Sequence, residues 1–170
     1  RYAFLWKTSS VKLKSRPSLL HELGQQVYRE PYMASFEHNG KELTILNYHS
    51  RKHYDKPELE IKLIIDYILG LQVKNIIFGG DFNCNESHEV FEELFRAGYN
   101  SALKNQGTTL KRECKNGIYL NHPIDNIYFF VKDFNFSKSS IIDIIGDCCE
   151  LKERRNSLSD HVPVCLILQE

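Results

Sequence analysis

The sequence predicts an α/β fold because one strand–helix–strand unit can be recognised in it and two further strands follow. Residues 43–49 form a β-branched and apolar run, and residues 75–78 form a short, wholly apolar run, as expected for buried strands. Between them, residues 57–70 carry apolar side chains at helical spacing. Two more strands are expected at residues 124–131 and 162–168.

Local signals mark the ends of these elements. Pro57 suits the first turn of the helix, where its missing N–H is not needed. The two glycines at residues 79–80 are expected to stop the second strand before the polar Asp81. A second short helix is expected over residues 89–97, where Gly98 ends it.

The two flanks of the chain are expected to be less regular. Residues 2–7 and 11–14 lie on either side of a Thr-Ser-Ser turn, which predicts a β-hairpin. Residues 132–159 are polar and are expected to be mostly loop.

The composition is that of one globular domain covering residues 1–170, with 42% hydrophobic and 26% charged residues. Lys+Arg and Asp+Glu both number 22, so the formal net charge is zero and a globally basic nucleic-acid-binding surface is excluded. The apolar runs are too short to span a membrane. Five cysteines without Cys-x-x-Cys spacing favour buried or incidental thiols over a zinc site.

Polar side chains gather at the expected strand ends, where α/β proteins build their sites. An additional carboxylate, Asp125, lies inside an otherwise apolar strand, and burying it requires a partner. The polar residues at strand ends are His49, Asp81, Asn83, Asp160 and His161.

Three motifs carry a resemblance to a known family. Gly79-Gly-Asp-Phe-Asn83 resembles the Gly-Asp-x-Asn signature of the endonuclease/exonuclease/phosphatase superfamily, and Ser159-Asp-His161 resembles its closing signature. Pro123-Ile-Asp-Asn-Ile127 resembles the intervening strand that carries an Asp. Each motif alone is weak, but all three occur in the family's order and at predicted strand ends.

Within the superfamily, the chain is most similar to the deoxyribonuclease I branch. Residues 1–7, residues 29–31 and the strand ending in His49 are similar to stretches of deoxyribonuclease I and of cytolethal distending toxin. The abasic-site repair branch usually has a Tyr in the last region, and Tyr48 adjoins His49. This resemblance favours an extracellular or periplasmic protein.

The resemblance implies part of a two-sheet α/β sandwich with helices outside and with the amino-terminal strands missing. The chain matches about the last two thirds of the family domain. The missing third carries a glutamate that is a principal metal ligand in the family. The domain is therefore expected to be incomplete at its amino terminus, and the 170-residue chain alone is expected to be nearly inactive.

The activity that the resemblance implies is metal-dependent hydrolysis of a phosphodiester, with DNA as the substrate of an endonuclease. In this scheme His161, paired with Asp125, contacts the phosphate and transfers a proton, and His49 is a second proton-transfer histidine. Asp81 orients the attacking water and Asn83 donates to a phosphate oxygen. The metal, Mg²⁺ alone or with Ca²⁺ or Mn²⁺, is expected on Asp160. Further substrate contacts are expected from Thr108, Thr109, Arg51 and Arg112.

Two other functions fit the same motifs. The fold can act on another phosphoester, such as a sphingomyelin-like lipid or an inositol phosphate, because motifs at the phosphate do not identify what is attached to it. A non-catalytic binding module with this fold is the third hypothesis. Retention of Asp81, Asn83, Asp125, Asp160 and His161 together argues against that module.

Overall fold

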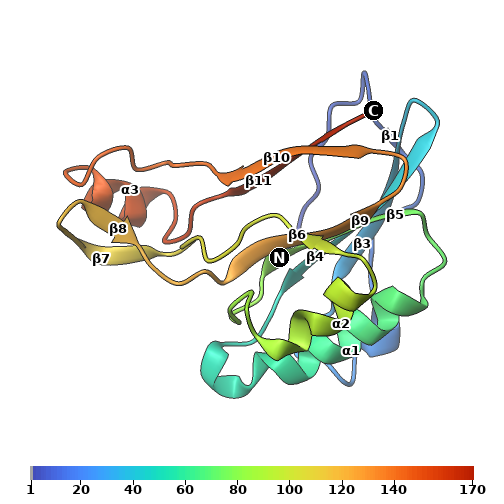
Figure 1. The fold of residues 1–170 in the computed structure, drawn as a ribbon, viewed down its shortest axis with the longest axis horizontal. Coiled ribbons are helices and arrows are strands. Elements are labelled where there is room, and N and C mark those ends of the chain that lie inside the picture. The colour runs from blue at the N-terminus through green and yellow to red at the C-terminus, as the bar shows by residue number, and fades with distance from the viewer. Residues whose placement is uncertain (1) are drawn as a thin grey trace.

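A computed structural model describes residues 2–170, which form a seven-stranded sheet, two two-stranded sheets and three α-helices (Figure 1). The helices are α1 (Pro57–Gly70), α2 (Glu92–Arg96) and α3 (Leu151–Ser157), and single 3-10 turns lie at His21–Leu23, His53–Asp55 and Glu89–Phe91. The strands are β1 (Lys12–Leu13), β2 (Ser18–Leu19), β3 (Tyr32–His38), β4 (Lys41–His49), β5 (Asn75–Asp81), β6 (Asn100–Ser101), β7 (Leu110–Lys115), β8 (Ile118–Leu120), β9 (Asp125–Val131), β10 (Asn135–Ile141) and β11 (Val164–Gln169). None of the helices in this range is long and apolar enough to cross a membrane.

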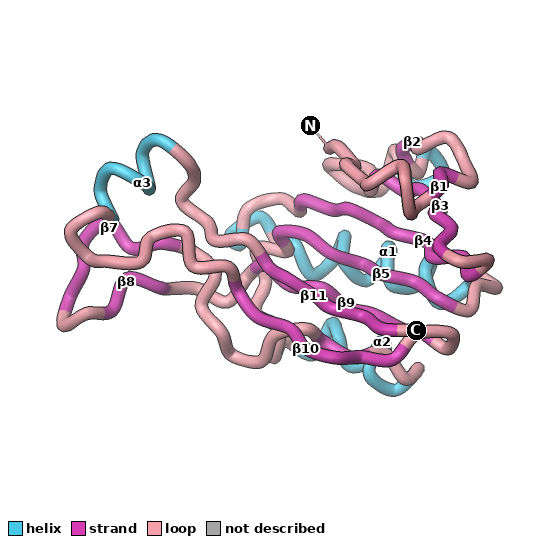
Figure 2. Tube along the Cα trace, turned by 90° about the horizontal axis from the view of Figure 1, so that it is seen from above, coloured by secondary structure: helices cyan, strands magenta, loops and turns pink. Residues whose placement is uncertain are grey.

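The large sheet has the strand order β1-β3-β4-β5-β9-β6, and β2 also pairs with β3. β4 and β5 are parallel and joined through α1, whereas β3 and β9 are antiparallel to these central strands. Helices α1 and α2 cover one face of the sheet, and the β10–β11 pair runs along the opposite side (Figures 1 and 2). The β7–β8 hairpin and α3 form a separate lobe at one end of the molecule.

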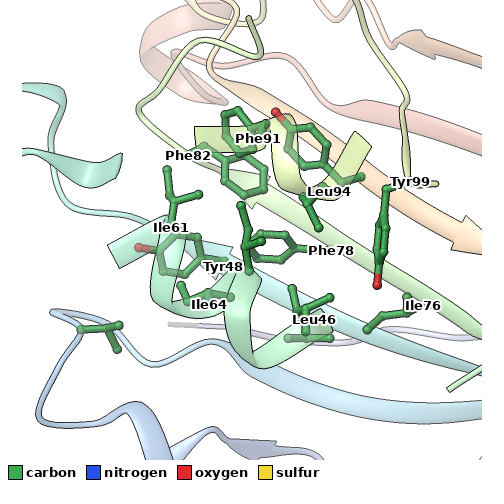
Figure 3. Packing of buried hydrophobic residues seen from close by; sticks show 14 of the residues in the cluster. Leu46, Tyr48, Ile61, Ile64, Ile76, Phe78, Phe82, Phe91, Leu94 and Tyr99 are labelled. Atoms are coloured by element: carbon green, nitrogen blue, oxygen red, sulfur yellow. The ribbon is translucent and has the colours of Figure 1, made fainter. Parts of the chain in front are cut away.

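The core lies between the sheet and α1. Alternate residues of β4 and β5 point to this face because successive side chains of a strand point to opposite sides. Ile61 and Ile64 of α1 meet them at helical spacing, as Figure 3 shows. Complete burial of such side chains contributes about 1.5–3 kcal/mol each. The strand residues of this layer are Leu46, Tyr48, Ile76, Phe78 and Tyr128.

A carboxylate also lies in this layer. Glu60 of α1 is only 2% exposed, and it accepts a hydrogen bond from the Tyr48 hydroxyl at 3.0 Å. Its other oxygen accepts from the Tyr28 backbone N–H and from the Arg51 guanidinium. Burial of a carboxylate is costly without such partners. Glu60 therefore fixes two loops, those around Tyr28 and Arg51, to the end of β4.

The helix predicted over residues 57–70 is confirmed, but three other expectations about the fold were wrong. The predicted hairpin is absent, because residues 2–7 form no strand. Phe4 of this segment instead packs on Tyr32 and Phe36, which lie on one face of β3. β5 continues through its two glycines to Asp81. Residues 132–159 contain β10 and α3, because polar residues are tolerated where one side of an element faces solvent.

The cysteines also differ from the expectation of incidental thiols. Cys114 of β7 and Cys148 form a disulfide across 34 residues, which joins the β7–β8 hairpin to the segment that precedes α3. Spacing alone does not determine disulfide connectivity, so the sequence left this pairing open. Cys84, Cys149 and Cys165 are free.

Candidate active site

The candidate site is built on one row of residues across three neighbouring strands. His49 is the register partner of Asp81 in the parallel β4–β5 pair, and Asp81 is the partner of Asp125 in the antiparallel β5–β9 pair. Register partners in a sheet point to the same face. The three side chains therefore lie side by side on the face opposite α1, at the edge where β4 and β5 end and β9 begins.

His161 reaches this row from a distant part of the sequence. An isolated antiparallel bridge joins it to Thr109, and its Nδ1 lies 2.8 Å from Asp125 Oδ2. The predicted contact between these two residues is thus present. The carboxylate fixes the ring orientation and places Nε2 on the other side of the imidazole.

Thr108 holds Asp125 in place. It is fully buried, and its hydroxyl donates to Asp125 Oδ2 at 2.7 Å, the oxygen that also contacts His161. The same hydroxyl oxygen accepts from the backbone N–H of Asp125 at 3.0 Å and of Ile124 at 3.3 Å. Since Thr108 has no exposed surface, the structure gives it a positioning role, and its predicted contact with substrate is not supported.

The two histidines have opposite electrostatic environments. The hydrogen bond with Asp125 raises the pKa of His161 above its ordinary value. Burial lowers the pKa of His49, and the positive charges of Arg29 and His161 also lower it. The Asp81 carboxylate, 3.6 Å away, acts in the opposite direction. Near neutral pH, His161 therefore retains its proton more strongly than His49 does.

Burial and the neighbouring Asp125 raise the pKa of Asp81. Two carboxylates in one half-buried row repel each other, and a cation between them would offset this repulsion. Among residues 2–170, one group of three can offer ligand atoms within 4.8 Å of one another, and it consists of Asp81, Asp125 and His161. Its two carboxylates suit Mg²⁺ or Mn²⁺, so the residues present fit a divalent cation.

Asp160, the predicted metal ligand, is not part of this group. Its side chain is 62% exposed, and its carboxylate lies 3.7 Å from the Arg155 guanidinium. The Asp160 carboxylate therefore lies outside the group of Asp81, Asp125 and His161. The predicted role of Asp160 as a metal ligand stays a prediction.

Asn83 follows the row in a tight turn. Its backbone N–H donates to Asp81 Oδ1 at 2.9 Å, and its own φ is 47°, a left-handed value that Asn tolerates well. This turn orients the Asp81 carboxylate and keeps Asn83 within two residues of it. The predicted role of Asn83 at the phosphate stays a prediction.

The other predicted substrate contacts are placed differently. The Arg51 guanidinium pairs with the buried Glu60, so the structure gives it a structural partner in place of a phosphate. Arg112 is exposed on β7, in the lobe formed with β8 and α3, and makes no hydrogen bond or ion pair with the row among the described residues. Thr109 is adjacent to the site through its bridge to His161, and its hydroxyl is buried without a partner in residues 2–170.

Sequence reasoning missed Arg29. Its guanidinium donates to the backbone carbonyl of Ser50 at 2.8 Å, and the Ser50 N–H donates to the carbonyl of Asp81 at 2.9 Å. A conspicuous Arg-Glu-Pro sequence marked this position, but only the fold shows that it secures the end of β4. The Tyr2 hydroxyl accepts from the His49 N–H at 3.1 Å and acts at the same point.

A cleft of about 320 Å³ leads from the row along the sheet. Asp81 and Asp125 lie at its polar end, and apolar side chains of the central strands and of the segment before β11 line the remainder. Apolar walls lower the local dielectric and strengthen the electrostatic interactions of the polar end. The apolar lining includes Phe4, Ile45, Ile77, Ile127 and Val162.

Comparison with known proteins identifies the fold. No protein-family model and no curated protein matches the sequence. Among solved structures, TDP2 of D. rerio complexed with a single-strand DNA product superposes with a TM-score of 0.66 at 14% identity, over 96% of this chain and 70% of TDP2. A mannosyl-6-phosphatase of Bacteroides thetaiotaomicron gives 0.64 at 15% identity, over 97% and 69%. The human Nocturnin catalytic domain gives 0.57 at 14%, over 94% and 61%.

A further match is an endonuclease/exonuclease/phosphatase family protein of Bacteroides thetaiotaomicron, with a TM-score of 0.63 at 15% identity. The chain therefore has the endonuclease/exonuclease/phosphatase fold. The predicted fold class is confirmed, and the fold is that of the superfamily that the motifs resemble. The chain spans about 61–70% of the length of TDP2, of the mannosyl-6-phosphatase and of the Nocturnin catalytic domain.

The separation of the two histidines is testable by NMR titration in EDTA. The His161 imidazole is expected to titrate above pH 6.5 and the His49 imidazole below it, because Asp125 stabilises the protonated ring of His161 and burial disfavours the charge on His49. Asp125→Asn is expected to lower the His161 midpoint, since it removes the charge of the partner. Titration of His49 above His161 would contradict this arrangement.

The positioning role of Thr108 predicts a difference between two conservative variants. Thr108→Val keeps the volume but leaves two backbone N–H groups and Asp125 without their hydroxyl partner, at a cost of about 1–3 kcal/mol in the free energy of unfolding. Thr108→Ser keeps the hydroxyl and loses one methyl group, at about 1 kcal/mol or less. Urea unfolding measures both, and a Val variant as stable as the parent would refute the role.

Proposed function

We propose that this protein is a metal-dependent phosphodiester hydrolase of the deoxyribonuclease I-like branch that cleaves DNA as an endonuclease. The observation that carries the proposal is the close placement of two His–Asp pairs, His161–Asp125 and His49–Asp81, in one row at the end of the sheet. Hydrolysis of a phosphodiester needs a base for the water and an acid for the leaving alkoxide. Two histidines with opposite pKa shifts suit these roles.

The geometry supports one role for each residue. His161 keeps its proton and donates toward the phosphate or the leaving oxygen, while Asp125 holds its ring through Nδ1. His49, more often neutral, accepts a proton from water that Asp81 orients between the two rings. A bound divalent cation supplies charge stabilisation for the phosphate, and Asp81 and Asp125 are the carboxylates that would hold it.

The number of ligands limits this cation site. Mg²⁺ prefers six oxygen ligands, and the group offers two carboxylates and an imidazole, one carboxylate being shared with Thr108 and His161. Residues 1–170 alone are expected to hold the cation weakly and to show little activity. The activity assay described below therefore uses the protein purified from its natural source.

The choice of DNA and of compartment rests on resemblance and supporting detail. The structural neighbour TDP2 was solved with a single-strand DNA product, and the flanks of the motifs are most similar to deoxyribonuclease I. The Cys114–Cys148 disulfide supports an oxidising compartment, which agrees with an extracellular or periplasmic protein.

The activity test compares nicking of supercoiled plasmid and hydrolysis of bis(p-nitrophenyl) phosphate in Mg²⁺ and in EDTA. We expect EDTA to abolish both activities and His161→Ala to reduce them by about 10²–10⁴-fold, the usual contribution of general acid–base catalysis. His122→Ala is the matched control, because the side chain of His122 is exposed outside the row.

Three outcomes would contradict the proposal. Activity that persists in EDTA would exclude the cation. Full activity of His161→Ala would exclude the proton transfer. Cleavage of sphingomyelin or an inositol phosphate without cleavage of DNA would keep the hydrolase and replace its substrate.

A further inference from the structure

Two exposed tyrosines lie on the loops that border the proposed active site. Tyr28 is 68% exposed and Tyr54 is 64% exposed, although tyrosine rings are usually more covered than this. Tyr28 precedes β3, and Tyr54 lies in the 3-10 turn that follows β4. Neither ring contributes to the hydrophobic core, so their exposure calls for an explanation other than folding.

A positively charged side chain lies over each ring. The Arg29 guanidinium carbon lies 5.1 Å from the centre of the Tyr28 ring, and the Lys52 ammonium lies 5.7 Å from the centre of the Tyr54 ring. Each of the two loops therefore presents an exposed ring with a positive charge over its face.

Glu60 joins the two loops. One of its oxygens accepts both the Tyr28 backbone N–H and the Arg51 guanidinium, and Arg51 is adjacent to Lys52. Among residues 2–170, neither Arg29 nor Lys52 forms an ion pair with a carboxylate, although Asp55 lies in the same 3-10 turn as Tyr54. The positive charges of Arg29 and Lys52 therefore remain available to an anion.

The same surface is connected to the active site. Arg29 donates to the carbonyl of Ser50, the residue after His49, and Ser50 is hydrogen-bonded to the backbone of Asp81. A phosphate in the row of His49 and Asp81 thus has the Tyr28 and Tyr54 loops as its neighbours. Each nucleotide of a polynucleotide carries one phosphate and one base. This repeat matches a surface on which each loop carries one cation and one aromatic ring.

Resting on the proposed function, we propose that Tyr28, Arg29, Lys52 and Tyr54 form a platform that binds a single-stranded polynucleotide beside the hydrolytic site. Unpaired bases expose their faces to aromatic rings, whereas the bases of a duplex are stacked on one another. The cations bind the flanking phosphates. The platform accordingly favours single-stranded over fully paired substrate.

The test measures binding of fluorescein-labelled dodecamers of deoxythymidylate and of uridylate by anisotropy, in EDTA and at fixed low salt. Tyr28→Ala and Tyr54→Ala are each expected to weaken binding by about five-fold to a hundredfold, the usual effect of removing one stacking ring. Tyr28→Phe and Tyr54→Phe keep the ring and are expected to bind within about twofold of the parent. The deoxythymidylate and uridylate arms show whether DNA, RNA or both are bound.

Phe136→Ala is the matched control, because Phe136 is a 52%-exposed aromatic residue on β10, away from these loops, and its loss should leave binding unchanged. Parent-like binding by both alanine variants, or losses in the phenylalanine variants as large as those of alanine, would overturn the proposal. If the alanine variants lost binding to anionic phospholipid vesicles but kept parent-like binding to the dodecamers, the proposal would also be overturned. The predicted losses in a protein that hydrolyses no phosphoester would support the platform and refute the proposed function separately.

Discussion

The strand register of β4, β5 and β9 is the constraint on which the site depends. It places His49, Asp81 and Asp125 in one row, and a slip of a single residue would turn each side chain to the opposite face. Gly80 helps to fix this register, because a Cβ there would lie 1.8 Å from the Tyr48 carbonyl oxygen and its φ of 148° suits glycine. β5 runs past its glycines to Asp81, which carries the carboxylate into the row.

The two faces of the large sheet have different roles: one packs against the core, and the other bears the candidate active site. On one face, α1 and the alternate residues of β4, β5 and β9 form a closely packed core that holds the strand ends rigidly. On the other face, the row opens into the apolar cleft, and segments from elsewhere in the chain complete it: Thr108 and His161 from one side and Arg29 from the other. One carboxylate serves each face. Glu60 secures the loops from within the core, and Asp125 secures the imidazole at the surface.

Much of this arrangement could be predicted from sequence, and the remainder could not for physical reasons. Periodicity located α1 and the central strands, and the cost of burying Asp125 predicted a partner that the structure shows to be His161. The position of His161 beside Asp125 depends on its bridge with Thr109, which no local pattern specifies. Arg51 was expected to contact substrate, because no local pattern shows that its partner is Glu60, nine residues later. β10 escaped prediction because its polar sequence lacks a continuous apolar stripe.

The central claim is that Asp125 and His161 act as one catalytic unit on a phosphoester. A double-mutant cycle on metal-dependent hydrolysis of bis(p-nitrophenyl) phosphate tests it, with the parent, Asp125→Asn, His161→Ala and the combined variant compared by kcat/KM. The account predicts that the combined variant is about as slow as His161→Ala alone, because a carboxylate that works through the imidazole has nothing left to orient. Losses that multiply in the combined variant would show that the two residues act independently and would contradict the account.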